Sequence, residues 1–248
     1  CVKLKVPTTY WCCVNCPGNP GAWKRHAVYH KAVQRQWKAN EDGGVGQQRQ
    51  RELAEQQARM AAQSGDAYSE LLAEGARYQS QQDARRAARA FREAIALRPD
   101  KPEAYYNLGA VLSNSEHAVE AAQRFLEARE RMLVGSGHWA QATAVAFNML
   151  AQKACAEVAK PEWWSEEGLK ALSARVARAA PDNLAATQMR AAVLRGRFGA
   201  WELGPRSAAE LTEAAVHFDR SAALQPAPAL KAELGERADW CRSQAGAM

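Results

Sequence analysis

The sequence has no run of 18 consecutive apolar residues, and therefore no segment is expected to span a membrane. The stretch closest to such a run, residues 132–152, is interrupted by His138, Gln141 and Asn148, which favours a buried helix. Ten prolines and sixteen glycines among 248 residues are too few for a collagenous or disordered chain. Because 47% of the residues are hydrophobic and 24% are charged, we expect most of the chain to fold.

Sequence signatures of common enzymes are absent as well. The chain has no G-x-S-x-G, no glycine-rich phosphate loop and no H-E-x-x-H. His117, His138 and His217 each stand alone, without a paired base or nucleophile nearby in the sequence. We therefore expect the protein not to be an enzyme.

The beginning of the chain is unusual in three respects. It starts with Cys1 rather than Met and shows no apolar secretory segment, so we expect an incomplete or processed reading frame. Four of the six cysteines lie in the first sixteen residues instead of in evenly spaced pairs, which favours metal binding over disulfides. These features predict an intracellular protein, cytoplasmic or nuclear.

The excess positive charge is confined to the first quarter of the chain. Residues 1–60 carry ten Lys and Arg against four acidic residues, which already equals the net charge of +6. The other 188 residues hold 23 charges of each sign. The basic N-terminal segment is therefore the only electrostatic indication of an anionic partner such as nucleic acid.

A set of thiols and imidazoles in this segment predicts a structural zinc site. The expected ligands are Cys13, Cys16, His26 and His30, with Cys12 and Cys1 as alternates. Two thiolates and two imidazoles complete the closed tetrahedron of a structural zinc ion. The alternative is a disordered basic start that carries free thiols and surface histidines.

The same residues resemble the end of a MYND-type zinc finger. The resemblance rests on Tyr10-Trp-Cys12-x3-Cys16 followed by Trp23-x2-His26-x3-His30, and it covers about thirty residues. The early C-x2-C pairs of that family are missing, the last ligand is a histidine, and the spacer after Cys16 is longer. Either preceding residues of the finger are lost, or the four predicted ligands close one site alone.

The strongest pattern is an internal repeat with a period of 34 residues, between Tyr68 and Val134. The recurring pairs are Gly75 and Gly109, Ala87 and Ala121, Phe91 and Phe125, Ala94 and Ala128, Leu71 and Tyr105, and Tyr78 and Leu112. An ordinary helical hairpin would not reproduce six equivalent positions at one period.

These positions closely resemble the tetratricopeptide repeat (TPR), which has this period. The resemblance implies an all-α fold, a TPR-type helix-turn-helix solenoid wound as a right-handed superhelix. Within a unit we expect Gly75 to face Ala87, so that the two helices approach closely, while Phe91 fills the space beside them.

The expected organisation has three parts. Residues 1–32 form the zinc-finger-like segment, residues 33–64 a basic joint and exposed helix, and residues 65–248 the TPR-like array. The expected units are residues 68–101, 102–135, 138–183 and 184–227, followed by a capping helix over residues 228–244. We expect helices over 138–158 and 161–180 in the third unit, and Trp240 packing inward from the capping helix.

The TPR resemblance implies a protein-protein interaction scaffold or adaptor that receives a peptide or a partner helix in a concave groove. The groove residues expected in the second unit are Tyr106, Asn107, Ala110 and Asn114. Some chaperone-binding members of the family grip a C-terminal carboxylate with Lys and Asn, but residues 71–76 supply no Lys, so this binding mode is not expected. The alternative function is a chromatin- or nucleic-acid-associated regulator that uses the basic N-terminal segment.

Overall fold

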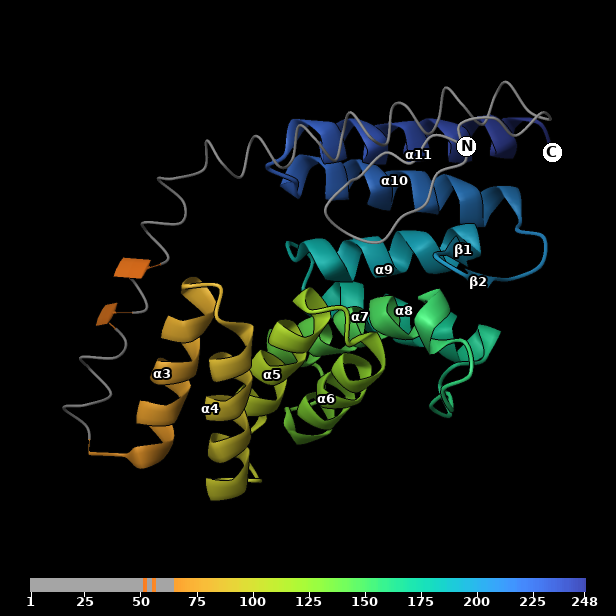
Figure 1. Ribbon diagram of the computed structural model, residues 1–248. Coiled ribbons are helices and arrows are strands. Elements are labelled where there is room, and N and C mark those ends of the chain that lie inside the picture. Colours follow the sequence, from red (N-terminus) through yellow and green to blue (C-terminus); the bar gives the residue numbers. More distant parts are fainter. Residues whose placement is uncertain (1–50, 53–54, 57–64) are drawn as a thin grey trace, which may run out of the picture. The chain divides into compact units, whose positions relative to one another are not determined.

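The computed structural model describes residues 51–52, 55–56 and 65–248, all within one unit of the chain, Val45–Met248. Residues 65–248 form nine α-helices (Figure 1). They are α3 (Ala67–Ser80), α4 (Ala84–Leu97), α5 (Pro102–Asn114), α6 (Ala118–Arg131), α7 (Gly137–Leu150), α8 (Glu166–Ala179), α9 (Leu184–Arg195), α10 (Ala208–Leu224) and α11 (Pro228–Gly246). The described chain is therefore an all-α array of helices, as the repeat predicts.

Two smaller elements interrupt the array. A short 3-10 helix, η1 (Lys153–Cys155), follows α7. The strands β1 (Arg197–Phe198) and β2 (Trp201–Glu202) form an antiparallel hairpin after α9, in which Phe198 pairs with Trp201.

Each helix packs against the next one along the chain. Every consecutive pair of helices from α3 to α11 is in contact, and α7 also contacts α9. In Figure 1, α3 to α6 lie next to one another, α9 to α11 form a stack that runs across them, and α7 and α8 lie between. This nearest-neighbour packing is typical of a solenoid.

Side-chain caps define where most of these helices begin. The capping residues are Asp66, Asp83, Ser136, Ser165, Asn183 and Ser207, and each side chain accepts a hydrogen bond from the backbone N–H three residues later. The helices α5 and α11 instead begin with Pro102 and Pro228. Proline is tolerated there because a first-turn N–H has no partner within the helix.

The third pair of helices differs from the sequence prediction. The helix α7 ends at Leu150 instead of reaching residue 158, and α8 begins at Glu166 instead of residue 161. Lys160 Nζ donates a hydrogen bond to the Leu150 carbonyl oxygen at 3.0 Å, which satisfies an acceptor left free at the helix end. Residues 151–165 are therefore an insertion between two helices.

In the first two pairs an aromatic ring of the second helix lies directly over a glycine of the first. A Cβ atom on Gly75 would lie 2.5 Å from Phe91 Cε1, and one on Gly109 would lie 3.0 Å from Phe125 Cδ1. The repeat pattern predicts that Ala87 faces Gly75 at this crossing. Ala87 is buried in the same cluster, but the residue for which the glycine makes room is the phenylalanine.

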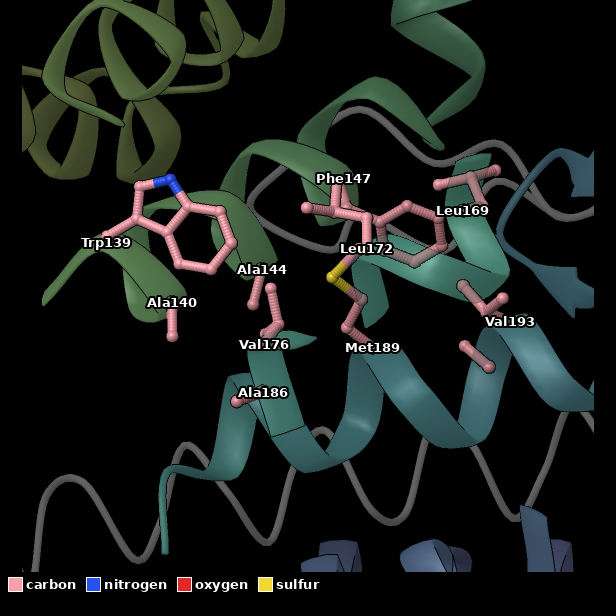
Figure 2. Close-up of a cluster of buried hydrophobic side chains, with 11 residues drawn as sticks. Trp139, Ala140, Ala144, Phe147, Leu169, Leu172, Val176, Ala186, Met189 and Val193 are labelled. Carbon is pink, nitrogen blue, oxygen red and sulfur yellow. The ribbon is translucent and has the colours of Figure 1, made fainter. Parts of the chain in front are cut away.

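The third and fourth pairs share a separate core (Figure 2). Its large members are Trp139 and Phe147 of α7, Leu169, Leu172 and Val176 of α8, and Met189 and Val193 of α9. Trp139 and Phe147 are at most 1% exposed. This cluster explains why α7 carries no Asp, Glu, Lys or Arg: most of the helix is enclosed by its neighbours.

The expectation that Trp240 packs inward is wrong, because this side chain is 49% exposed. The helix α11 buries Leu234, Ala238 and Cys241 against α10. Successive residues of an α-helix are separated by about 100°, so a position two residues after Ala238 points away from that face.

Candidate binding face

Half-buried side chains on α3, α5 and α7, the first helices of the first three pairs, form what we call the first-helix face. Its members are Leu72, Tyr106, Asn107, Ala110, Gln141, Val145 and Asn148. Four of them, Leu72, Tyr106, Ala110 and Val145, pack partly against one core cluster that contains the buried Phe91, Leu108 and Phe125. The face therefore belongs to a well-packed part of the array.

Three of the four predicted groove residues belong to this face. Tyr106, Asn107 and Ala110 are half-buried, whereas Asn114, the last residue of α5, is exposed. Binding of a peptide or helix to these side chains stays a prediction.

Tyr106 links the first helices of the second and third pairs. Its hydroxyl oxygen accepts a hydrogen bond from Gln141 Nε2 at 2.8 Å, and its ring meets that of Phe125 edge-on, with 5.3 Å between centroids. Burial raises the pKa of Tyr106 above its ordinary value, although the bond from Gln141 acts in the opposite direction. The phenol is therefore neutral at physiological pH, and its own proton is free to be donated.

Charged residues are segregated between first and second helices. The helices α4 and α6 carry eleven Asp, Glu, Lys and Arg residues together, whereas α5 and α7 carry one, Glu103; the first helix α3 is an exception with three. Glu103 Oε2 accepts a hydrogen bond from the Tyr68 hydroxyl at 3.1 Å. This segregation can be read in the sequence, and it is the signal for a binding face that the repeat analysis missed.

One buried polar atom of the first-helix face has no hydrogen-bond partner among the described residues. Asn148 Oδ1 is buried and accepts no hydrogen bond. Asn148 follows Gln141 by two helical turns and so lies on the same side of α7. A buried acceptor left unpaired costs about 1–3 kcal/mol, and because this oxygen is itself buried, the cost falls on the fold rather than on a docking surface.

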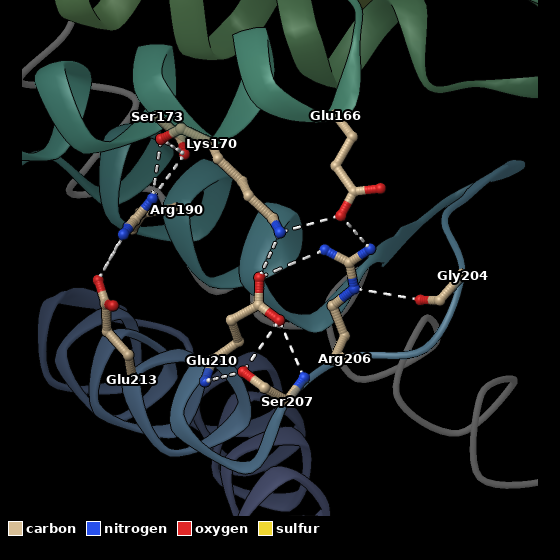
Figure 3. Close-up of polar contacts among 9 residues, drawn as sticks. All are labelled: Glu166, Lys170, Ser173, Arg190, Gly204, Arg206, Ser207, Glu210 and Glu213. Carbon is tan, nitrogen blue, oxygen red and sulfur yellow. Dashed lines mark hydrogen bonds and ion pairs between the residues drawn. The ribbon is translucent and has the colours of Figure 1, made fainter.

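Away from this face, four charged side chains connect α8 to α10 (Figure 3). Lys170 Nζ lies 2.9 Å from Glu166 Oε1 and 2.6 Å from Glu210 Oε1. Arg206, whose side chain is 5% exposed, donates from Nη2 to Glu166 Oε1 at 2.7 Å and from Nε to the Gly204 carbonyl oxygen at 3.1 Å. These bonds satisfy two of the three guanidinium nitrogens, and the third, Nη1, makes no hydrogen bond but lies 3.6 Å from Glu210 Oε1, so the buried charge has two acidic partners.

Glu210 carries a pH-dependent part of the stability. Burial alone would raise its pKa, but hydrogen bonds from Lys170 and from the backbone and hydroxyl of Ser207 lower it from 4.5 to about 2. Because the pKa is lower in the folded state, the ionised group contributes stability that is fully present above pH 4.5 and is lost as the pH falls toward 2. We expect Glu210→Gln to reduce the free energy of unfolding by about 2–3 kcal/mol at pH 6, and this difference from wild type to shrink as the pH approaches 2.

Urea denaturation of both proteins between pH 6 and pH 2 measures this difference. Replacement of the exposed Glu236 of α11 by Gln removes one carboxylate outside this ion-pair group and is the matched control. A difference between Glu210→Gln and wild type that stays constant over this range would contradict the prediction.

The ion pair between Arg206 and Glu166 also connects two insertions of the array. The first is residues 151–165, and the second is residues 196–207, between α9 and α10. Arg206 in the second pairs with Glu166, which directly follows the first. Aromatic rings join them as well: Phe147 lies 5.4 Å from Trp164, 5.7 Å from Phe198 and 5.5 Å from Trp201, measured between centroids.

The predicted zinc ligands Cys13, Cys16, His26 and His30, and the alternates Cys12 and Cys1, lie outside the described residues. In the part of the chain that the structure describes, no group of three or more His, Cys, Asp or Glu side chains could hold a metal ion. Cys155 and Cys241 are buried free thiols. None of the helices between residues 65 and 248 is long and apolar enough to cross a membrane.

The sequence model of the TPR repeat matches residues 75–115. The match begins at Gly75 in α3, includes all of α4 and α5, and ends at Ser115. It confirms the TPR prediction for this part of the array. A comparison with curated proteins finds no match to the chain.

Proposed function

We propose that the protein is a scaffold or adaptor that binds another protein through its first-helix face, and that it has no catalytic role. The observation that carries this proposal is the difference in charge between α5, which carries only Glu103, and the second helices α4 and α6, which carry eleven charged residues together. A solvated helix face normally carries charged residues, and an uncharged face with half-buried apolar side chains is typical of a contact surface. TPR repeats generally mediate such protein-protein contacts.

Site-specific photo-crosslinking in cells tests this proposal. A photoreactive phenylalanine analogue placed at Ala110 should yield a crosslinked protein of discrete mass, because this position lies on the first-helix face. The same analogue at Val119, which is 46% exposed on the second helix α6, is the matched control. Adducts only at Val119, or equally at both positions, would argue against the proposal.

We also propose a structural zinc module formed by Cys13, Cys16, His26 and His30. The support is their spacing, since four soft ligands within eighteen residues suit a closed tetrahedral site. Metal analysis should find about one zinc ion per chain, and a Cys13→Ser/Cys16→Ser variant should lose it. The buried Cys155 and Cys241 do not compete for the ion. A zinc content near zero in the unaltered chain would overturn this proposal.

The basic charge of residues 1–60 favours one other function, a chromatin- or nucleic-acid-associated regulator. It would show as salt-dependent binding of non-specific DNA or RNA that is lost when residues 1–46 are deleted. If the chain does not bind DNA or RNA even at low salt, this alternative function is wrong.

A further inference from the structure

We propose that Arg129 of α6 and Arg175 of α8 bind a phosphate group, free or attached as a monoester, beside the first turns of α7. This inference goes beyond the proposed function, because the site lies away from the first-helix face. Helical geometry places Trp139 and Thr143, the α7 residues next to these arginines, roughly 160° around the helix from Gln141.

Arg129 is a half-buried cation that its neighbours hold in position. Its Nε donates a hydrogen bond to Thr143 Oγ1 at 3.1 Å, and the buried Thr143 hydroxyl donates in turn to the Trp139 carbonyl oxygen at 2.7 Å. Arg129 Cζ lies 5.7 Å from the centre of the Trp139 ring and 5.5 Å from that of the Trp163 ring. The guanidinium group is therefore oriented before a ligand binds, which reduces the entropy lost on binding.

The two terminal nitrogens of Arg129 are the donors that a ligand can reach. In the part of the chain that the structure describes, neither Nη1 nor Nη2 has a hydrogen-bond partner, and neither belongs to the buried polar atoms that lack one. Arginine presents such donors as a planar fork, which matches two oxygens of a phosphate group.

Arg175 brings a second positive charge to the same indole ring. It is exposed on α8, and its Cζ lies 5.3 Å from the centre of the Trp139 ring. Burial and, to a smaller extent, the charge of Arg175 lower the pKa of Arg129, whereas the adjacent Glu130 raises it. The two cations therefore repel each other, and an anion bound to both would relieve this repulsion.

No carboxylate of the described residues forms an ion pair with Arg129 or Arg175. The helix α7 has no Asp or Glu, and after Lys170 the only charged residues of α8 are Arg175 and Arg178. A phosphate group carries a charge of about −1.5 to −2 at pH 7, so it can balance two guanidinium groups, whereas one carboxylate cannot. This charge balance favours phosphate as the ligand.

Isothermal titration calorimetry of the full chain with sodium phosphate at pH 7.5 tests this inference, with the ionic strength held constant by sodium chloride. Arg175→Ala should weaken phosphate binding about tenfold, because it removes a charge-assisted contact from an exposed position. Arg129→Lys keeps the charge but removes the planar fork, and it should also weaken binding. Circular dichroism checks that both variants retain their helices.

The matched control is Arg85→Ala on α4. Like Arg175, Arg85 is exposed and has no acidic partner among the described residues, so its removal changes the net charge by the same amount. This variant should bind phosphate as tightly as the unaltered chain.

A capped phosphoserine, titrated in the same way, distinguishes the two sources of the phosphate group. Tighter binding of phosphoserine than of inorganic phosphate would indicate a phosphorylated chain as the ligand, and equal or weaker binding would indicate the free ion; both results support the site. The inference is overturned if the unaltered chain does not bind phosphate, or if neither Arg175→Ala nor Arg129→Lys weakens binding, as expected for phosphate held by the basic residues 1–60. These outcomes leave the proposed scaffold function unaffected.

Discussion

Phe147→Ala is expected to lower the free energy of unfolding by about 3–5 kcal/mol, the range for removing a fully buried aromatic ring. Phe147 is 0% exposed and lies in the core shared by the third and fourth pairs. Its ring also contacts aromatic rings of both insertions, at Trp164, Phe198 and Trp201. Truncation would therefore leave a cavity where the repeats meet the insertions, and the surrounding rings could fill it only in part.

Urea denaturation monitored by circular dichroism and by tryptophan fluorescence measures this effect. The midpoint should fall while the slope changes little, because the native state stays folded. Leu133→Ala is the control: this side chain is 81% exposed between α6 and α7, and its truncation should change stability by no more than about 0.5 kcal/mol. A loss below about 1 kcal/mol for Phe147→Ala would mean that the insertions repack into the space.

The sequence predicts the first two pairs well because their packing positions recur at a fixed period. Gly75 and Phe91 are separated by sixteen residues, as are Gly109 and Phe125, and both pairs form the same contact. A pattern repeats along the sequence only where equivalent positions of neighbouring units make the same contacts with the same residue types. The regular part of the fold could therefore be read without coordinates.

The insertions could not be predicted because their contacts join residues that are distant in the sequence. Trp164 meets Trp201 only after residues 151–165 and 196–207 fold against each other, and neither segment shows a helical or strand period. The expectation of a buried helix in residues 132–152 is confirmed for Trp139 to Leu150, most of which is buried in α7, but not for Leu133 and Val134, which are 81% and 61% exposed before that helix begins. Nothing in the sequence indicates that the helix ends at Leu150, whose carbonyl oxygen accepts a hydrogen bond from Lys160, ten residues later.

The first-helix face likewise has a part that the sequence predicted and a part that it did not. The repeat register places Tyr106, Asn107 and Ala110 on one side of α5, and the structure leaves that side partly open. The members contributed by α7 were not predicted, because the third pair departs from the glycine and alanine pattern. The hydrogen bond from Gln141 to Tyr106, and the packing of Val145 against the same core cluster as Tyr106, show that α7 extends the face.

The second large effect concerns the glycine over which the Phe91 ring lies. Gly75→Ala is expected to lower the free energy of unfolding by about 1–3 kcal/mol, even though alanine is the better helix former by about 1 kcal/mol. The reason is steric: the new Cβ would lie 2.5 Å from Phe91 Cε1, and Phe91 is fully buried and cannot move away freely. Gly109→Ala meets its ring at 3.0 Å, so the steric cost and the helix-forming gain should nearly cancel.

A third glycine completes the series and supplies the control. Gly235 lies within α11, and a Cβ there would meet nothing within 4 Å, so Gly235→Ala should raise stability by up to about 1 kcal/mol. In a Phe91→Leu background the cost of Gly75→Ala should fall, because the ring that it strikes is absent. Equal effects of alanine at Gly75, Gly109 and Gly235 would contradict the close contact between helix and ring on which the repeat depends.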